Sequence, residues 1–200
     1  EISNLGFDKD YHKAVRYAKG EFCWLMTDDD LLELNAVEKV LNKINKKIDL
    51  IVVNSKVMNA NFSKVLAERQ LNIKSDVSYL DKGGILIKYV GASISCICCI
   101  IIRRTLWISR NRKKFYGTFF IHVGVVLQSP SINNVLLISD PLILIRYGNA
   151  SWTQKAFKIW NIDWPQLIWS FNSLSFDEKM KICRKHPYLR FSTLFYNKAM

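Results

Sequence analysis

The sequence predicts an α/β fold in which helices flank a mixed sheet and a helical segment follows at the C-terminus. Amphipathic and apolar stretches alternate in the first 55 residues, in the order helix, strand, acidic loop, helix, strand. Half of the 200 residues are hydrophobic and 23% are charged, which is typical of a chain with one substantial core. After residue 148, tryptophan and lysine are frequent and glycine is rare. We therefore expect an α/β domain over residues 1–148 and a helical extension over residues 149–200.

Residue spacing predicts the first elements in order. Residues 11–18 place apolar and small side chains on one helical face, and the following Lys-Gly pair ends that helix. Residues 22–26, FCWLM, are long enough for a buried parallel strand. Apolar residues recur at helical spacing over residues 34–44, and residues 48–55, IDLIVVNS, form a second strongly apolar strand.

The second half of the α/β region is less regular. Residues 92–107 predict a strand that leads into a short basic helix, and residues 116–129 predict a helix. Residues 133–148 predict a pair of strands separated at Asp140 and Pro141, because proline cannot donate a hydrogen bond within a sheet.

The C-terminal segment carries its own helix signals. Ser175 followed by Glu178 predicts a helix start, and Pro187 predicts the end of that helix. Residues 152–185 are rich in tryptophan and lysine, a composition that is typical of segments lying at a membrane interface. Packing of these tryptophans against the sheet is an equally good interpretation.

Residues 28–30 are three consecutive aspartates at the end of the first predicted strand. Ligands of open α/β sheets bind beyond the carboxyl ends of strands, and clustered carboxylates are suited to Mg²⁺ or Mn²⁺. A bound divalent cation would relieve the repulsion among the three charges and would bridge to a substrate diphosphate. The alternative is a solvated acidic turn that begins the next helix.

The charge of the chain favours anionic partners. The formal net charge is +12, and the basic residues are spread along the sequence, which fits a membrane surface or an anionic substrate better than a nucleic-acid groove. The most apolar stretch, residues 85–102, is interrupted by lysine, glycine and serine, so we expect no spanning helix. The five cysteines match no zinc or redox spacing, and we expect them to pack in the core of a cytoplasmic protein.

Three segments resemble a known family. Residues 4–32, NLGFDKDYHKAVRYAKGEFCWLMTDDDLL, resemble the region around the DxD motif of family 2 glycosyltransferases, which have the GT-A fold. Residues 101–107, IIRRTLW, and 116–129, YGTFFIHVGVVLQS, resemble the abequosyltransferase-like branch of bacterial O-antigen assembly. The resemblance implies a GT-A-like mixed sheet and transfer of a hexose, for example a dideoxyhexose such as abequose, from a nucleoside diphosphate donor. It further implies Mg²⁺ or Mn²⁺ as cofactor, a lipid-linked oligosaccharide acceptor, no nucleic acid, and a place at the inner face of the bacterial membrane.

The resemblance assigns roles to five residues near the N-terminus. Asn4 and Gly6 match the donor-binding loop before the first helix. Asp29 and Asp30 match the metal-binding pair, and Asp28 would then face the ribose of the donor. In a competing register, Asp28 and Asp30 form the DxD pair.

The sequence departs from the family in three ways. In many relatives the strand ends in D-x-D-D, whereas Thr27 stands in place of the first aspartate here. Relatives carry a Glu-Asp pair in the acceptor region, whereas the corresponding residues 117–124, GTFFIHVG, contain no carboxylate. His122 is the titratable group there, so it is the candidate catalytic base, and a hydrogen-bonded histidine in a packed helix is the alternative. The family also places strands before the acidic motif that we expect to be missing here, which would leave an N-terminally incomplete fold with part of the donor site.

A second hypothesis requires no catalysis. A basic α/β module, or an inactive fragment, would bind a membrane surface or nucleic acid through its positive charge. The basic residues Arg103 and Arg104 and the cluster at 110–114 could contact phosphates in either hypothesis, or they could be ordinary surface charges. A metal-dependent nuclease is a weaker hypothesis, because no further carboxylates complete a two-metal site.

Overall fold

The computed structural model describes residues 6–80, 85–148 and 153–189. Seven strands of this part form one mixed sheet in the order β1-β6-β3-β7-β2, with β4 added to β3 and β5 added to β7. Their bounds are Phe22–Trp24 (β1), Leu31–Leu32 (β2), Leu50–Met58 (β3), Val65–Ala67 (β4), Val77–Leu80 (β5), Ile100–Arg103 (β6) and Asn134–Arg146 (β7). The predicted α/β class with a mixed, GT-A-like sheet is confirmed.

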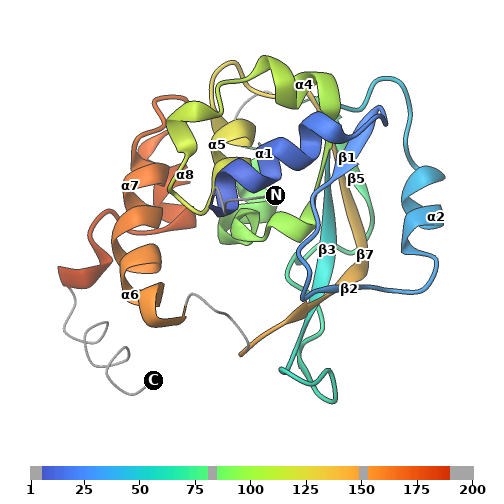
Figure 1. Cartoon of the computed structure of the whole chain (residues 1–200), viewed down its shortest axis with the longest axis horizontal. Coiled ribbons are helices and arrows are strands. Elements are labelled where there is room, and N and C mark those ends of the chain that lie inside the picture. Colours follow the sequence, from blue (N-terminus) through green and yellow to red (C-terminus); the bar gives the residue numbers. More distant parts are fainter. Residues whose placement is uncertain (1–5, 81–84, 149–152, 190–200) are drawn as a thin grey trace.

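Helices cover both faces of the sheet (Figure 1). The α2 helix lies on one side, while α1, α5 and the C-terminal helices lie on the other. The helices are Phe7–Tyr17 (α1), Ala36–Leu41 (α2), Ile85–Val90 (α3), Arg104–Ser109 (α4), Ile121–Leu127 (α5), Ala156–Lys158 (α6), Trp164–Trp169 (α7) and Phe176–Ile182 (α8). Short 3₁₀ helices span Gly91–Ser95, Ile97–Cys99, Lys113–Phe115, Thr153–Lys155 and Pro187–Leu189, and a π-helical turn spans Ile159–Asp163.

The centre of the sheet is the parallel pair β3 and β7, and the other strand pairs are antiparallel. The prediction that residues 22–26 form a parallel strand is therefore wrong. β1 pairs antiparallel with β6, with Cys23 opposite Ile102. An apolar run indicates a buried strand, but it contains no information on the direction of a partner nearly 80 residues away.

The predicted break at Pro141 is also wrong, because β7 continues through it. The register between β3 and β7 shifts at Val53, Asn54 and Ser55, where Asn54 lies opposite Pro141. A proline lacks the N–H that a regular ladder needs, so it is tolerated at this irregularity.

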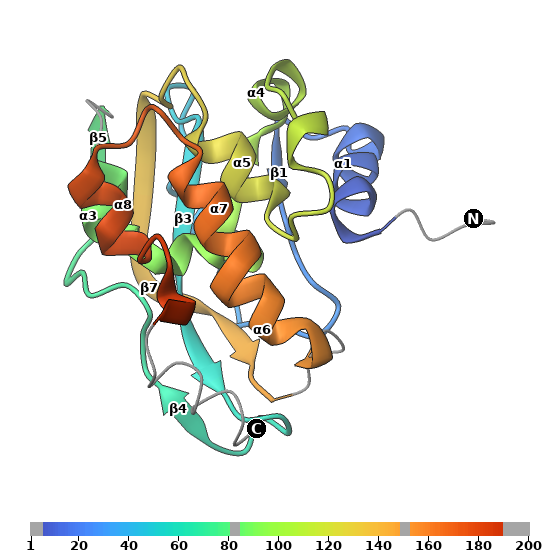
Figure 2. The same ribbon diagram turned by 90° about the vertical axis from the view of Figure 1, so that its left-hand side faces the viewer.

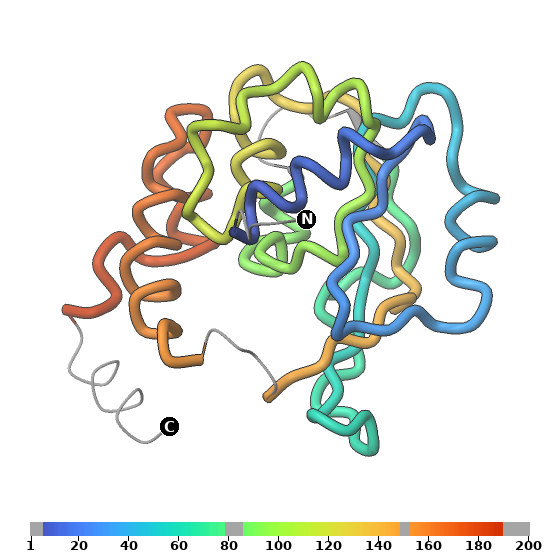
Figure 3. Tube along the Cα trace, viewed as in Figure 1, coloured from blue at the N-terminus to red at the C-terminus, as the bar shows by residue number. Residues whose placement is uncertain are grey.

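The predicted helix over residues 34–44 is reduced to α2. Leu31 and Leu32 instead form β2 on the edge of β7, and the Glu33 N–H donates to the carbonyl oxygen of Leu142. Asn35, which precedes α2, has a left-handed backbone with φ of 61°, so the helix starts only at Ala36. The tube view shows this chain path, from α1 through β1 along the sheet to β2 and then to α2 (Figure 3).

The helical C-terminal segment is confirmed in its described part. The α6 helix, the π-helical turn and α7 follow one another along one side of the molecule (Figure 2). Ser175 and Glu178 form the predicted capping box at the start of α8, which packs against α3. No helix in the described ranges is long and apolar enough to cross a bilayer. The division into two domains after residue 148 stays a prediction.

Candidate functional site

A cavity of about 190 Å³ lies where the chain leaves β1. Asp29 and Asp30 line it, together with Arg146 at the end of β7. Phe119 and Phe120, which precede α5, and Trp160 of the π-helical turn line it as well. A larger cavity of about 560 Å³ lies among the C-terminal helices, but it contains no carboxylate. The smaller cavity therefore combines acidic, basic and aromatic groups in one place.

The acidic loop is fixed to its neighbours by hydrogen bonds. Asp30 Oδ1 accepts from the Arg146 backbone N–H at 2.9 Å, and Asp30 Oδ2 accepts from Thr27 Oγ1 at 2.6 Å. The Tyr11 hydroxyl of α1 donates to the Met26 carbonyl oxygen at 2.9 Å. These bonds orient Asp30, and each of its oxygens retains a lone pair that could face a cation.

The three aspartates have different surroundings. Asp29 is half-buried and lines the cavity, whereas Asp28 is exposed and does not line it. The structure therefore brings Asp29 and Asp30 together at the cavity, as the preferred register expects, and leaves Asp28 outside. Their metal-binding role and the ribose contact of Asp28 stay predictions.

The acidic residues do not form a three-ligand metal cage. In the described ranges, the only group of three converging His, Cys, Asp or Glu side chains is Cys96, Cys98 and Cys99. Two carboxylates nevertheless fit Mg²⁺ or Mn²⁺, because such ions are usually held by one or two carboxylates, with water and substrate phosphates as the other ligands. Asp29 and Asp30 could supply this partial ligand set.

Asp8 contacts the segment that carries Phe119 and Phe120, two of the residues that line the cavity. It is 4% exposed, and its two oxygens accept from the backbone N–H groups of Phe119 and Ile121, both at 3.0 Å. Burial raises the pKa of Asp8, and these hydrogen bonds oppose that shift. Phe119 has a φ of 65°, which is uncommon for a bulky residue. We infer that the Asp8 carboxylate holds the loop before α5 in this conformation.

Sequence reasoning missed this role of Asp8, although a signal existed. An aspartate at the start of a helix suggests an N-terminal cap, but the structure shows no side-chain cap of α1. Asp8 instead shares a helix face with Tyr11 and Val15, at spacings of three and four. A carboxylate on an otherwise apolar face predicts a buried polar partner.

The aromatic lining of the cavity depends on the C-terminal segment. The Phe120 ring lies 5.4 Å from the Trp160 ring and 4.6 Å from the Trp164 ring, measured between centroids. Trp160 and the neighbouring Ile159, which also lines the cavity, belong to the π-helical turn. Such turns frequently occur at functional sites, because the extra residue redirects side chains.

His122 does not line the cavity. It is 1% exposed, and its Nε2 lies 3.1 Å from the carbonyl oxygens of both Ile94 and Ser95. Its Nδ1 is buried without a hydrogen-bond partner, and burial lowers the pKa of His122 to about 4. These contacts match the alternative of a packed, hydrogen-bonded histidine. The catalytic role stays a prediction.

The two donor-loop residues are only partly described. Gly6 has a φ of 84°, and its carbonyl oxygen accepts from the N–H groups of Lys9 and Asp10, which begins α1. The next residue, Phe7, lines the cavity. The donor-binding role of Gly6 stays a prediction, and Asn4 lies outside the described residues.

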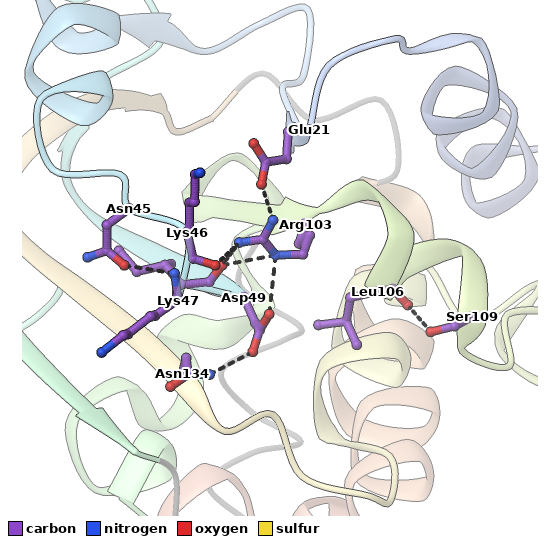
Figure 4. A network of polar contacts seen from close by, with 10 residues as sticks. Glu21, Asn45, Lys46, Lys47, Asp49, Arg103, Leu106, Ser109 and Asn134 are labelled. Atoms are coloured by element: carbon purple, nitrogen blue, oxygen red, sulfur yellow. Dashed lines mark hydrogen bonds and ion pairs between the residues drawn. The ribbon is translucent and has the colours of Figure 1, made fainter.

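Two arginines that could have contacted phosphates have structural roles instead. Arg103 pairs with Glu21 and Asp49 and donates to the carbonyl oxygens of Lys46 and Ile48 (Figure 4). This network lies at the start of β1, whereas the aspartates follow its end. The Arg110 guanidinium likewise donates to backbone carbonyls.

Arg146 is the cation that the structure places beside the carboxylates. Its guanidinium carbon lies 4.7 Å from the centroid of the Phe62 ring, and its Nε is buried without a hydrogen-bond partner in the described part of the chain. No local pattern near the aspartates indicates Arg146, because it follows them by more than 100 residues.

Comparisons with known proteins identify the family of the chain. Glycosyl transferase family 2 matches residues 2–108, which include α1, β1, the acidic loop and β6. The abequosyltransferase RfbV of Salmonella typhimurium strain LT2 is 23% identical over 163 residues, which cover 76% of this chain and 49% of the relative. The chain thus spans about half the length of that relative. Because the family match covers more than half of the chain and contains the acidic loop, the chain belongs to glycosyl transferase family 2.

Proposed function

We propose that the chain transfers a hexose from a nucleoside diphosphate donor to a lipid-linked oligosaccharide, in the biosynthesis of O-antigen or another cell-surface polysaccharide. The observation that carries the proposal is that Asp29 and Asp30 line the same cavity as Phe120 and Trp160. The abequosyltransferase relative supports a dideoxyhexose such as abequose as the donor sugar.

Asp29 and Asp30 would hold Mg²⁺ or Mn²⁺ in this proposal. The bound cation would neutralise the charge that develops on the diphosphate leaving group. Asp30 is kept in position by Thr27 and the Arg146 backbone, and Asp29 faces the same cavity. The Arg146 side chain lines the cavity beside them and could pair with a phosphate oxygen.

The carboxylates and the aromatic rings that line the cavity fit the polar hydroxyls and the apolar C–H faces of a sugar. Carboxylates accept hydrogen bonds from hydroxyl groups, and aromatic rings cover the apolar C–H faces of a pyranose. A deoxygenated sugar has fewer hydroxyls and more apolar surface, which suits the largely apolar lining of Phe7, Ile97, Phe119, Phe120, Ile145 and Trp160.

Activation of the acceptor hydroxyl requires a base, and His122 stays the sequence-based candidate. Its Nε2 is engaged by two backbone carbonyl oxygens, so Nδ1 is the nitrogen that would take the proton. In the described structure Nδ1 is buried, and the role therefore requires movement of α5.

Calorimetry of nucleotide binding tests the proposal. The chain is titrated with UDP, CDP, GDP and dTDP in the presence of Mn²⁺, and the Asp29→Ala and Asp28→Ala variants are compared. We expect one nucleotide to bind in a metal-dependent manner, Asp29→Ala to abolish that binding, and Asp28→Ala to weaken it less, because Asp28 does not line the cavity and could lose only a ribose contact. Nucleotide binding that Asp29→Ala leaves unchanged would contradict the assignment of Asp29 as a metal ligand. Equal loss of binding in both variants would contradict it as well.

A non-catalytic basic module is the second candidate function. Its support is the net charge of +12 together with exposed aromatic and apolar side chains of the C-terminal segment, such as Phe176 and Met180. Lys179 and Lys185 both stack over the Trp169 ring at 5.7 Å, which places cations beside apolar surface. This module would bind an anionic membrane, or nucleic acid, with strong salt dependence and would not respond to Asp29→Ala. Peripheral attachment at the inner membrane face is compatible with both candidates.

A further inference from the structure

We propose that Cys96, Cys98 and Cys99 form a binding site for a soft divalent cation of the zinc class, in the wall of the same cavity. The three Sγ atoms all lie within 4.8 Å of one another, and those of Cys96 and Cys98 are 2.9 Å apart. Thiolate sulfur selects soft cations, whereas Mg²⁺ and Mn²⁺ prefer oxygen. This site is therefore separate from the carboxylate site and does not depend on the proposed transferase activity.

The backbone brings the three sulfur atoms together. Two successive 3₁₀ helices, Gly91–Ser95 and Ile97–Cys99, contain or flank the cysteines. The Cys96 N–H donates to the Ser93 carbonyl oxygen at 3.1 Å, and the Cys99 N–H donates to the Cys96 carbonyl oxygen at 3.3 Å. Four consecutive residues in tight turns can thus direct three side chains to one point.

The turn is held on a rigid frame. The Trp24 indole Nε1 donates to the Cys98 carbonyl oxygen at 2.8 Å, and the Leu25 N–H donates to the Ile100 carbonyl oxygen at 3.0 Å. Ile100 begins β6, which is the second strand from the edge of the main sheet. A site on such a frame loses little conformational freedom when an ion binds.

The distances suit a small cation. In a tetrahedral site with zinc–sulfur bonds of about 2.3 Å, two sulfur atoms lie about 3.8 Å apart. The Cys96 and Cys98 sulfurs, 2.9 Å apart, would need to open by about 1 Å, and no two of the three sulfurs are further apart than 4.8 Å. Such a shift requires only small rotations of the side chains.

Access and further ligands come from the cavity. Cys98 and Cys99 are buried, Cys96 is half-buried, and both Cys96 and Cys98 line the cavity. An ion can therefore enter from the cavity, and the fourth coordination position faces it. The Ser55 hydroxyl, 3.5 Å from Cys99 Sγ, is positioned as an outer-shell partner of that sulfur.

Ion binding exchanges protons for metal bonds. A cation displaces the thiol protons to solvent and forms sulfur–metal bonds in their place.

Titration with Cd²⁺ alone tests the site, because cadmium–thiolate bonds give a charge-transfer absorption in the ultraviolet. The metal-free chain is titrated without oxygen in a phosphine reductant, after all five cysteines have been shown to be free thiols. We expect a charge-transfer band that saturates at one equivalent and that Zn²⁺ displaces. A large excess of Mn²⁺ should leave the band unchanged.

Cysteine variants locate the binding. Cys98→Ser should weaken Cd²⁺ affinity by at least about 100-fold, since loss of an outer-shell partner alone costs about 10- to 100-fold. Cys183→Ser, which removes a cysteine outside the cluster, should bind as the wild-type chain does. Should Cys98→Ser fail to fold, the partly exposed Cys96→Ser takes its place, with circular dichroism as the check. Absence of the band, or equal binding by the cluster variant and Cys183→Ser, would overturn the proposal.

Discussion

Two acidic side chains near the cavity differ in their surroundings. Asp8 is buried, and both of its oxygens accept backbone hydrogen bonds. Asp29 is half-buried and faces the cavity. Replacement of Asp8 would disturb the loop that holds Phe119 and Phe120, whereas replacement of Asp29 leaves that loop intact. Replacement of Asp29 therefore tests ligand binding more directly than replacement of Asp8.

His122 should make the folded state sensitive to acid. Its pKa is lowered to about 4 by burial, from 6.5 in an unfolded chain. Because the folded pKa is the lower one, the stabilising contribution is complete above pH 6.5 and is lost as the pH falls toward 4. The shift corresponds to about 3 kcal/mol. We expect His122→Gln to remove this part of the pH dependence of the unfolding free energy, measured by urea denaturation.

A matched variant separates this effect from general acid denaturation. His186→Gln changes an exposed histidine and should keep the wild-type pH dependence. An unchanged slope in His122→Gln would refute the assignment. If His122 is also the catalytic base, the same variant should lose turnover while it retains nucleotide binding.

At the scale of elements, Asn54 joins three segments of chain. Its Oδ1 accepts from the backbone N–H groups of Ser55, Gln70 and Leu71, at 2.8 to 3.1 Å. Its Nδ2 donates to the carbonyl oxygens of Leu71 and Ser139, at 3.0 and 2.9 Å. Because this side chain lies at the register shift between β3 and β7, it replaces bonds that a regular ladder would make.

We expect Asn54→Ala to lower the unfolding free energy by at least about 3 kcal/mol, because several backbone groups would remain buried without partners. Asn59→Ala is the control, since Asn59 bonds to Ser63 and Lys64 in an exposed turn. Asn59→Ala should lower the unfolding free energy by about 1 kcal/mol or less. Denaturant unfolding measures the loss of unfolding free energy in both variants. Equal losses would show that Asn54 does not join the three segments.

Local patterns predicted the elements that are defined locally. The apolar face of α1 and the capping box of α8 are encoded within a few residues, and both are present in the structure. The partner of β1 and the continuity of β7 through Pro141 depend on strands far away in the sequence. Periodicity within a segment cannot specify such pairings.

The same distinction applies to the site. Residues 28–30 could be recognised from their position after a strand, and the structure places two of them in the cavity wall. Arg146 and Trp160 come to the cavity through β7 and the π-helical turn, and no pattern near the aspartates indicates them. The convergence of Cys96 with its two neighbours depends on 3₁₀ turns that spacing rules do not include.

At the scale of the whole molecule, the net charge of +12 predicts binding to anionic vesicles. Binding should fall steeply as salt screens the charges. The double substitution Lys181→Glu with Arg184→Glu, near the end of α8, should weaken vesicle binding by about 10-fold or more, because each cation contributes about 1 kcal/mol near such a surface.

The control for this prediction is Lys46→Glu with Lys47→Glu, which makes the same charge change after α2, on the other face of the sheet. Sedimentation with phosphatidylglycerol vesicles measures the bound fraction. Equal losses in the two double variants would show that total charge, rather than the C-terminal segment, determines binding.

The cavity also has a consequence for synthesis of the chain. Its walls come from α1, the acidic loop, the loop before α5, β7 and the π-helical turn, and the hydrogen bond from Arg146 to Asp30 spans 116 residues. The ribosome must therefore release Trp160 before the cavity can close. Until then, the aspartates made early in translation have neither their backbone donor nor their aromatic neighbours. The nascent chain carries the acidic motif long before the cavity around that motif exists.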